Sequence, residues 1–269
     1  GTGKFNFEAS VMITASHNPA DHNGLKVSGK EVKPIGYDTG LADLEEMIET
    51  LEIVPAQQKG SISDFDFHQE YLAFQMSYKK NISDLKIAMD VSNGMAGLFV
   101  HDLFGNQPHY IFDKIDGTFP NHEANPLDPE NVVDLQNTVK ETKADIGVIF
   151  DGDADRVMFV DENARFISPD LMIARLGHHF LEEAPNGVKV LQDIRTSKAV
   201  GEYLSQFGVD MHMWRVGRAY AAKKLKDIDG LFGGELAGHY YFKDFYYSDS
   251  GLLAAILILN IVAQKKKEG

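Results

Sequence analysis

The chain has 269 residues, 43% of them hydrophobic and 25% charged, which suits a globular protein of two or three domains because single cores seldom grow beyond about 250 residues. Its 40 acidic and 26 basic residues give a formal net charge of −14, so its field opposes binding to nucleic acid and to anionic membranes. The lack of cysteine excludes disulfides and thiolate metal sites, neither a signal sequence nor an apolar run of about 20 residues is visible, and we expect a cytoplasmic protein.

Taken in chain order, apolar runs that end in Gly, Asp or Asn alternate with helical patterns. Strands followed by turns are predicted before Ser16 and within 85–97, 144–156 and 188–200, and helices within 39–52, 129–143, 197–208 and 252–263. Alternation of this kind is typical of an α/β fold.

Two domain boundaries are predicted. A polar stretch at 52–83 contains an interdomain helix, and Pro169 separates a strand-like run from a new helix. We therefore expect domains at residues 1–80, 81–168 and 169–269, in which the last helix, at 252–263, is buried.

The acidic loop "DGDADR" carries the strongest chemical signal. Asp151, Asp153 and Asp155 follow an apolar strand, and carboxylates crowded into one turn repel one another unless a cation is bound. A solvated acidic turn is the plainer alternative. A calcium EF-hand is excluded because Arg156 stands where the loop needs Gly, and a strand-like run follows.

Two different nucleophiles are compatible with the sequence. Asp151 could form an aspartyl phosphate, with Asp153 as general acid, but this leaves the loop "TASHNP" at 14–19 unexplained. In that loop Ser16 lies beside His17, and Lys26 follows ten residues after the serine. No G-x-S-x-G motif supports a serine hydrolase.

Three loops together resemble the α-D-phosphohexomutases, in particular the phosphomannomutase/phosphoglucomutase group. They are "TASHNP", "DGDADR" and "GGELAGH" (233–239), and the segment "IDGTFPNHEANP" (115–126) is also similar to that family. The resemblance implies tandem α/β/α domains with mixed sheets and an active site in the cleft between domains. It implies phosphoryl transfer between C1 and C6 of mannose or glucose phosphate through a phosphoserine and a hexose 1,6-bisphosphate.

The resemblance also implies a role for each site residue. Ser16 would carry the phosphoryl group, one Mg²⁺ would be bound by the serine phosphate and the three aspartates, and a small sugar phosphate would be the partner. The remaining expected residues are His17, Lys26 and Arg156 beside the phosphate, and Glu235, His239, Arg195 and Arg218 at the sugar. The oligomeric state stays open.

Several departures from the family pattern limit the prediction. Ala237 replaces a usual Ser, and Arg218 stands where His is frequent, so the preferred sugar stays open. A C-terminal phosphate-binding domain and the start of the first domain have no counterpart, so we expect part of a longer enzyme with low activity by itself. An Asp151 phosphatase and a non-catalytic sugar-phosphate or magnesium-binding module remain alternatives.

Overall fold

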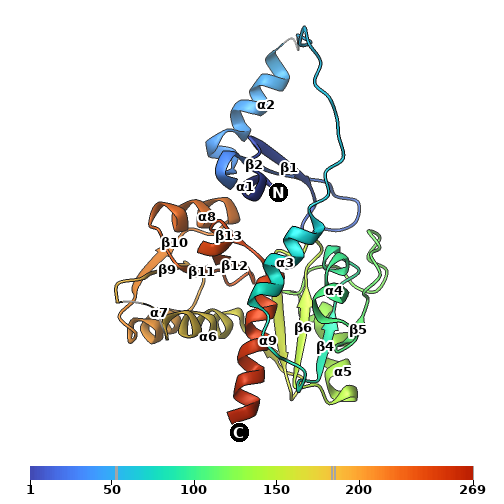
Figure 1. Ribbon diagram of the computed structural model, residues 1–269, viewed down its shortest axis with the longest axis vertical. Coiled ribbons are helices and arrows are strands. Elements are labelled where there is room, and N and C mark those ends of the chain that lie inside the picture. Colours follow the sequence, from blue (N-terminus) through green and yellow to red (C-terminus); the bar gives the residue numbers. More distant parts are fainter. Residues whose placement is uncertain (52–53, 183, 185, 269) are drawn as a thin grey trace.

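Three β-sheets, one for each α/β unit, organise the chain in space (Figure 1). The structure is a computed structural model, and it describes residues 1–51, 54–182, 184 and 186–268. Helices and strands alternate, and two of the sheets combine parallel with antiparallel strands. The predicted α/β class with mixed sheets is confirmed.

The first unit is an antiparallel sheet, ordered β1-β2-β3, followed by a helix. Its elements are α1 (Thr2–Phe5), β1 (Ala9–Ile13), β2 (Leu25–Gly29), β3 (Pro34–Ile35) and α2 (Leu41–Thr50). The strand predicted before Ser16 is therefore present. The helix predicted at 39–52 spans ten residues, and residue 52 lies outside the described part of the chain.

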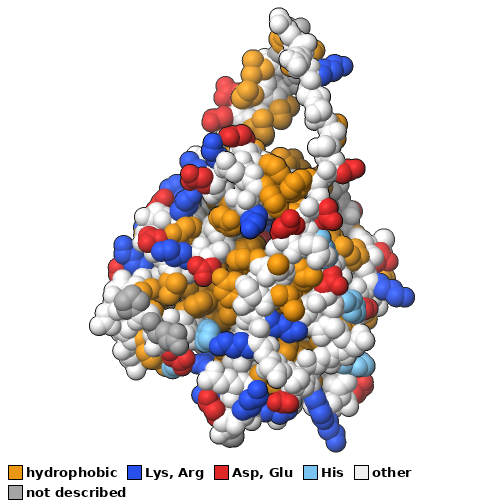
Figure 2. Space-filling model, viewed as in Figure 1, with side chains coloured by type: hydrophobic (Ala, Val, Ile, Leu, Met, Phe, Trp, Pro, Cys, Tyr) orange, Lys and Arg blue, Asp and Glu red, His pale blue; other side chains and the backbone are white. Residues whose placement is uncertain are grey.

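Apolar side chains of the first unit are unusually exposed (Figure 2). Val11 and Ile13 are 59% and 77% exposed on one face of β1, and Met12 is 44% exposed on the other. Leu44 and Ile48 of α2 are exposed as well. This unit therefore contributes little to the buried core.

The second unit has a five-stranded sheet ordered β5-β4-β6-β7-β8. Its elements are α3 (His68–Tyr78), β4 (Ile87–Asp90), α4 (Val100–Phe104), β5 (His109–Ile111), α5 (Val133–Thr142), β6 (Ile146–Phe150), β7 (Val157–Asp161) and β8 (Phe166–Ile167). Every residue of β6 is buried, as expected for a central strand that is covered on both faces. The helix predicted at 129–143 begins with a 3-10 turn, Pro129–Val132, whose N-cap is Asp128.

The third unit repeats this strand order as β10-β9-β11-β12-β13. Its elements are α6 (Pro169–Leu181), β9 (Lys189–Asp193), α7 (Lys198–Ser205), β10 (Asp210–Trp214), α8 (Arg218–Asp227), β11 (Phe232–Gly234), β12 (Tyr240–Phe242), β13 (Ser248–Asp249) and α9 (Gly251–Glu268). In both five-stranded sheets, the first three strands in the order are parallel, and each of the last two is antiparallel to the strand before it. The antiparallel sheet β1-β2-β3 has the arrangement of the last three strands. As a result, the loops that follow β1, β6 and β11 occupy equivalent places in the three units.

Helix α9 joins the cores of the second and third units. It lies between their sheets (Figure 1) and packs against α3, α6 and β7. Residues 251–261 are buried, so the predicted buried helix is confirmed, although it continues to Glu268 rather than ending at 263. Within the described residues, no helix has both the length and the apolar character that crossing a membrane requires.

Replacing Asn260 of α9 with leucine should destabilise the protein. The Asn260 amide accepts a hydrogen bond from Lys80 N–H at 2.9 Å and donates one to the carbonyl of Tyr78 at 2.8 Å. Leucine leaves both backbone groups at the end of α3 without these partners, at a cost of about 2 kcal/mol. Urea unfolding measures this loss. Gln264→Ala, an exposed change on the same helix, should stay within about 0.5 kcal/mol of the unmodified chain, and equal stability of the two variants would contradict the expectation.

Candidate active site

The three equivalent loops converge on one pocket of about 330 Å³. Each loop follows the carboxyl end of its strand, which is where open α/β sheets place their ligands. The pocket is lined by Ser16, His17, Lys26, Leu127, Asp155, Arg156, Arg195, Val216, Gly217, Arg218, Glu235, Ala237 and His239. The lining includes all the predicted site residues except Asp151 and Asp153, which belong to the aspartate loop but do not line the pocket. Residues from all three units therefore share one cleft.

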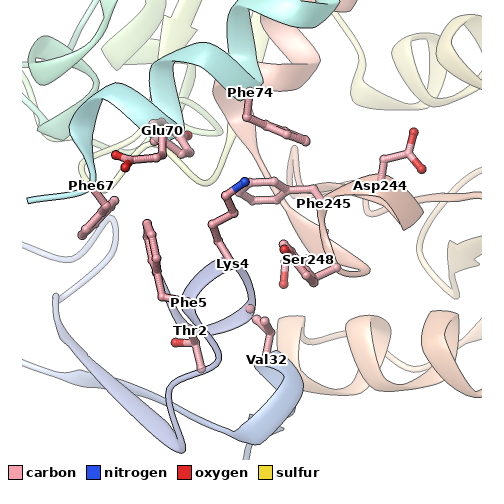
Figure 3. Close-up of a pocket in the computed structure, with 14 residues that line it drawn as sticks. Thr2, Lys4, Phe5, Val32, Phe67, Glu70, Phe74, Asp244, Phe245 and Ser248 are labelled. Atoms are coloured by element: carbon pink, nitrogen blue, oxygen red, sulfur yellow. The ribbon is translucent and has the colours of Figure 1, made fainter.

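A second cavity of about 350 Å³ lies between α1, α3 and the turn at Lys243–Phe245 (Figure 3). Its lining is largely apolar, with Phe5, Phe67 and Phe74 among the residues, and contains no predicted site residue. It lies apart from the three loops and does not bear on their chemistry.

The aspartate loop has three buried carboxylate oxygens that form no hydrogen bond, although Asp151 Oδ2 lies 3.7 Å from Nε of Arg156 and Asp155 Oδ1 lies 3.6 Å from Nδ1 of His239. They are Oδ2 of Asp151, Oδ1 of Asp153 and Oδ1 of Asp155, each buried without a hydrogen bond. The three carboxylates offer ligand atoms within 4.8 Å of one another, and burial together with its two acidic neighbours raises the pKa of Asp151. Hard oxygen ligands in such a group suit a divalent cation such as Mg²⁺, so the residues present fit the ion that the family resemblance implies.

Lys26 brings a positive charge from the first unit to this loop. Its Nζ donates hydrogen bonds to Asp153 and, at 2.6 Å, to Asp155. Burial opposes the charge, but the two carboxylates outweigh it and raise the pKa of Lys26. Lys26 therefore stays protonated and occupies one oxygen of each aspartate, which leaves the other oxygens available.

The serine loop touches the aspartate loop at the level of the backbone. A Cβ added to Gly152 would lie 2.5 Å from the backbone oxygen of Ser16. Ser16 has a left-handed backbone, with φ of 59°, and its Oγ lies 3.2 Å from Nδ1 of His17. Burial and the charge of Arg156 lower the pKa of His17, so its imidazole is neutral at neutral pH.

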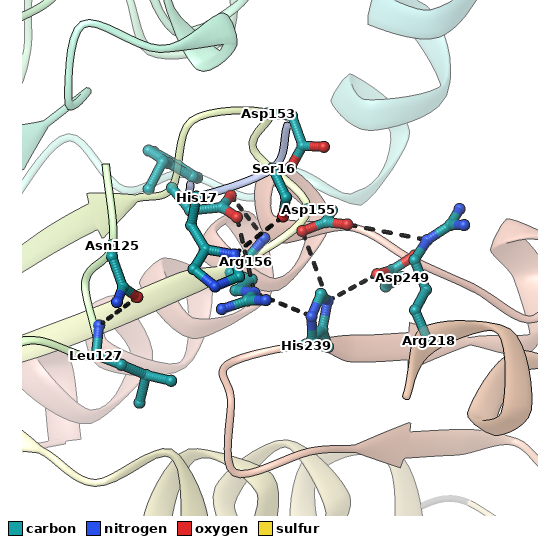
Figure 4. Close-up of polar contacts among 12 residues, drawn as sticks. Ser16, His17, Asn125, Leu127, Asp153, Asp155, Arg156, Arg218, His239 and Asp249 are labelled. Atoms are coloured by element: carbon teal, nitrogen blue, oxygen red, sulfur yellow. Dashed lines mark hydrogen bonds and ion pairs between the residues drawn. The ribbon is translucent and has the colours of Figure 1, made fainter. Parts of the chain in front are cut away.

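Arg156, His239 and Asp249 form a chain of hydrogen bonds, and the first two of these residues line the pocket (Figure 4). Nε of Arg156 donates to Nε2 of His239 at 3.0 Å, so Nδ1 of His239 carries the proton that it donates to Asp249 at 2.8 Å. Arg218 donates to the other oxygen of Asp249, also at 2.8 Å. Although burial opposes ionisation, the charge of Arg218 holds the pKa of Asp249 below its usual range.

Asp155, His239 and Asp249 form a second group with metal-ligand geometry. Unlike the three aspartates, His239 and Asp249 already use their polar atoms in hydrogen bonds with Arg156, with Arg218 and with each other. This group is therefore an internally paired network, and the cation site lies at the aspartate loop.

The sugar loop presents a buried carboxylate to the pocket. Oε1 of Glu235 accepts hydrogen bonds from Gly217 N–H and Tyr241 O–H, both at 3.2 Å, and burial raises the pKa of Glu235. Arg195 remains 44% exposed in its side chain while it pairs with Asp193 at 3.2 Å. Both groups are held in place by neighbouring residues while they line the pocket, where a ligand can contact them.

Three structural partners in the site have no place among the predicted residues. They are Thr14, which bonds to Asp153, Asp193, which also accepts the Leu236 N–H, and Asp249. Asp193 and Asp249 each stand at the end of a strand just before a turn or helix. That position was a usable signal for both, whereas Thr14 offered none apart from its place in "TASHNP".

Comparison with known proteins gives the same family for all three units. Residues 1–53, 66–164 and 168–268 match phosphoglucomutase/phosphomannomutase alpha/beta/alpha domains I, II and III. The chain is 34% identical to a phosphomannomutase of Vibrio cholerae, with 95% of this chain and 57% of the relative aligned, and 32% identical to one of Escherichia coli K12, with 97% and 59% aligned.

A crystal structure from Burkholderia thailandensis, a phosphoglucomutase/phosphomannomutase family protein, superposes with a TM-score of 0.87 at 30% identity, covering 95% of this chain and 56% of that one. The chain thus spans less than three fifths of the length of these relatives. With matches to three successive domains and the three loops assembled around one pocket, the chain belongs to the α-D-phosphohexomutase superfamily and resembles its phosphomannomutase/phosphoglucomutase members.

Proposed function

We propose that the chain carries the phosphoryl-transfer centre of a phosphohexomutase, which moves a phosphoryl group between C1 and C6 of mannose or glucose phosphate through phosphorylated Ser16 and a hexose 1,6-bisphosphate. The observation that carries the proposal is the set of three buried carboxylate oxygens without a hydrogen bond, in a loop that lies directly against the serine loop. Phosphoryl transfer depends on positioning and on neutralising charge more than on covalent assistance, and this site provides both.

Asp151, Asp153 and Asp155, together with the phosphate on Ser16, would hold one Mg²⁺. When bound, the ion would neutralise negative charge on the phosphoryl oxygens. The serine phosphate would add anionic oxygen to the three carboxylates, so phosphorylation should strengthen the affinity for the metal.

Two positively charged side chains of this chain would also neutralise the phosphate on Ser16. Lys26 and Arg156 line the pocket from different units, and both carry a positive charge next to Ser16. Nδ1 of neutral His17 lies 3.2 Å from Oγ of Ser16 and can take up a proton from this hydroxyl group. Glu235, His239, Arg195 and Arg218 would contact the sugar phosphate from the third unit.

An aspartyl phosphate on Asp151 has less support. This side chain is fully buried, is absent from the pocket lining, and accepts the backbone N–H of Arg156 through Oδ1. A nucleophile must reach its substrate, and Ser16 does line the pocket. The sugar loop, which lines the same pocket as Ser16, also favours a phosphoryl-transfer centre over a magnesium-binding module.

Ser16→Ala should abolish phosphate transfer to the protein. The chain is incubated with glucose 1,6-bisphosphate labelled in its phosphates and with Mg²⁺, and the labelled peptide is identified by mass spectrometry. Wild-type protein should carry acid-stable label on Ser16. The control Ser61→Ala, in an exposed segment, should be labelled normally. Hydroxylamine-labile label on Asp151 would refute the proposal and favour the phosphatase.

Glu235→Gln should weaken productive sugar binding. The substitution keeps the size of the side chain but removes the charge that would accept hydrogen bonds from the sugar, and the loss of a charged hydrogen bond is worth about ten- to hundredfold. The bisphosphate concentration that half-saturates Ser16 labelling should rise, and the maximal rate should fall, because an orienting contact serves both. Glu202→Gln on the exposed face of α7 is the control. Unchanged kinetics in the Glu235 variant would exclude this role.

A further inference from the structure

Thr14 connects the serine loop to the aspartate loop through a single hydroxyl group. Its Oγ1 donates a hydrogen bond to Oδ2 of Asp153 at 2.8 Å and accepts one from the backbone N–H of Ser16 at 2.9 Å. The backbone N–H of Thr14 is itself held by the carbonyl of Gly24 at 2.9 Å. The hydroxyl therefore has a fixed position from which it contacts both reacting parts of the site.

The donated bond fixes the orientation of the Asp153 carboxylate, and so the position of the oxygen that faces a cation. Thr14 and Lys26 both bind Oδ2 of Asp153, whereas Oδ1 is buried without a partner. A partial rotation of the carboxylate would break both bonds and turn its other oxygen away from the neighbouring aspartates. Thr14, a neutral donor that adds no repulsion toward the metal, thus holds Oδ1 toward Asp151 and Asp155.

The accepted bond determines the conformation of Ser16. A threonine hydroxyl that accepts the N–H two residues later forms an ST-turn. Ser16 adopts φ of 59°, a left-handed conformation that is uncommon for residues other than Gly. This turn supplies local stabilisation for the conformation that points the serine into the pocket.

We propose that Thr14 is a positioning residue that couples the geometry of the phosphoryl carrier to that of the metal ligand. One hydroxyl can make both bonds only when Ser16 has this backbone conformation and Asp153 has this carboxylate orientation. The geometry of the serine loop and that of the aspartate loop therefore depend on each other. The inference rests on the proposed function, in which Asp153 holds Mg²⁺ and Ser16 carries phosphate.

The test compares Thr14→Val, which keeps the shape and removes the hydroxyl, with Thr14→Ser, which keeps the hydroxyl. Calorimetric titration with Mg²⁺ alone and the initial rate of Ser16 labelling from glucose 1,6-bisphosphate are the two measurements. We expect Thr14→Val to weaken magnesium binding and to slow labelling by about tenfold or more each. Thr14→Ser should restore both to within about threefold, and Thr50→Val, on exposed α2, should match the wild type.

A double-mutant cycle separates positioning from a purely structural role. If Thr14 acts on the metal through Asp153, Thr14→Val should have no further effect on magnesium affinity in an Asp153→Asn background. An equal loss of magnesium affinity in both backgrounds, or unchanged affinity and labelling in Thr14→Val, would overturn the inference. The proposed function would still stand if Ser16 of the wild type is labelled. Absence of labelling and of magnesium binding in the wild type would overturn both.

Discussion

Mutual repulsion among three carboxylates is the constraint around which the site is built. Asp151, Asp153 and Asp155 lie in one turn after β6, and Asp151 has no contact with solvent. Burial makes each additional negative charge more costly, so the compensating cations must come close. Lys26 arrives from the first unit, and Arg218 approaches Asp155 at 3.9 Å from the third. The negative charge of this turn is therefore balanced only when the three units are assembled, and the assembly of the units in turn depends on this charge balance.

The parts of the site that could be predicted from the sequence are those encoded within a few consecutive residues. "DGDADR" places its carboxylates together whatever the rest of the chain does, and the order of the three loops indicates the family. Contacts between distant residues carry no such local signal. Thr14 and Asp153 are 139 positions apart, and Arg218 and Asp249 are 31 apart. Only the assembled sheets bring these pairs together, so the partners of Thr14 and Asp249 could not be assigned from the sequence, even though Asp249 stands at the end of a strand.

Prediction of the fold succeeded where the information lies in neighbouring residues and failed where it does not. The α/β class follows from the alternation of apolar strands with helical patterns, which is local information. The end of α9 was predicted too early because the apolar pattern stops near residue 263, while Lys and Glu continue the helix to Glu268 through their intrinsic propensity. The shared strand order of the second and third sheets was not visible at all, because the same layout is built from dissimilar residues, with pairing decided by packing across the whole sheet.

Helix α9 has a consequence for how the protein is made. It is the last element of the third unit, yet its buried residues belong to the same core cluster as Ile87, Val148 and Phe159 of the second unit. During synthesis on the ribosome, the second sheet emerges long before the helix that covers it. Domains of nascent chains tend to fold in order as they emerge, but here the second unit must wait with an apolar surface exposed until the third is nearly finished. The second and third units therefore acquire their full native packing together, once α9 is in place.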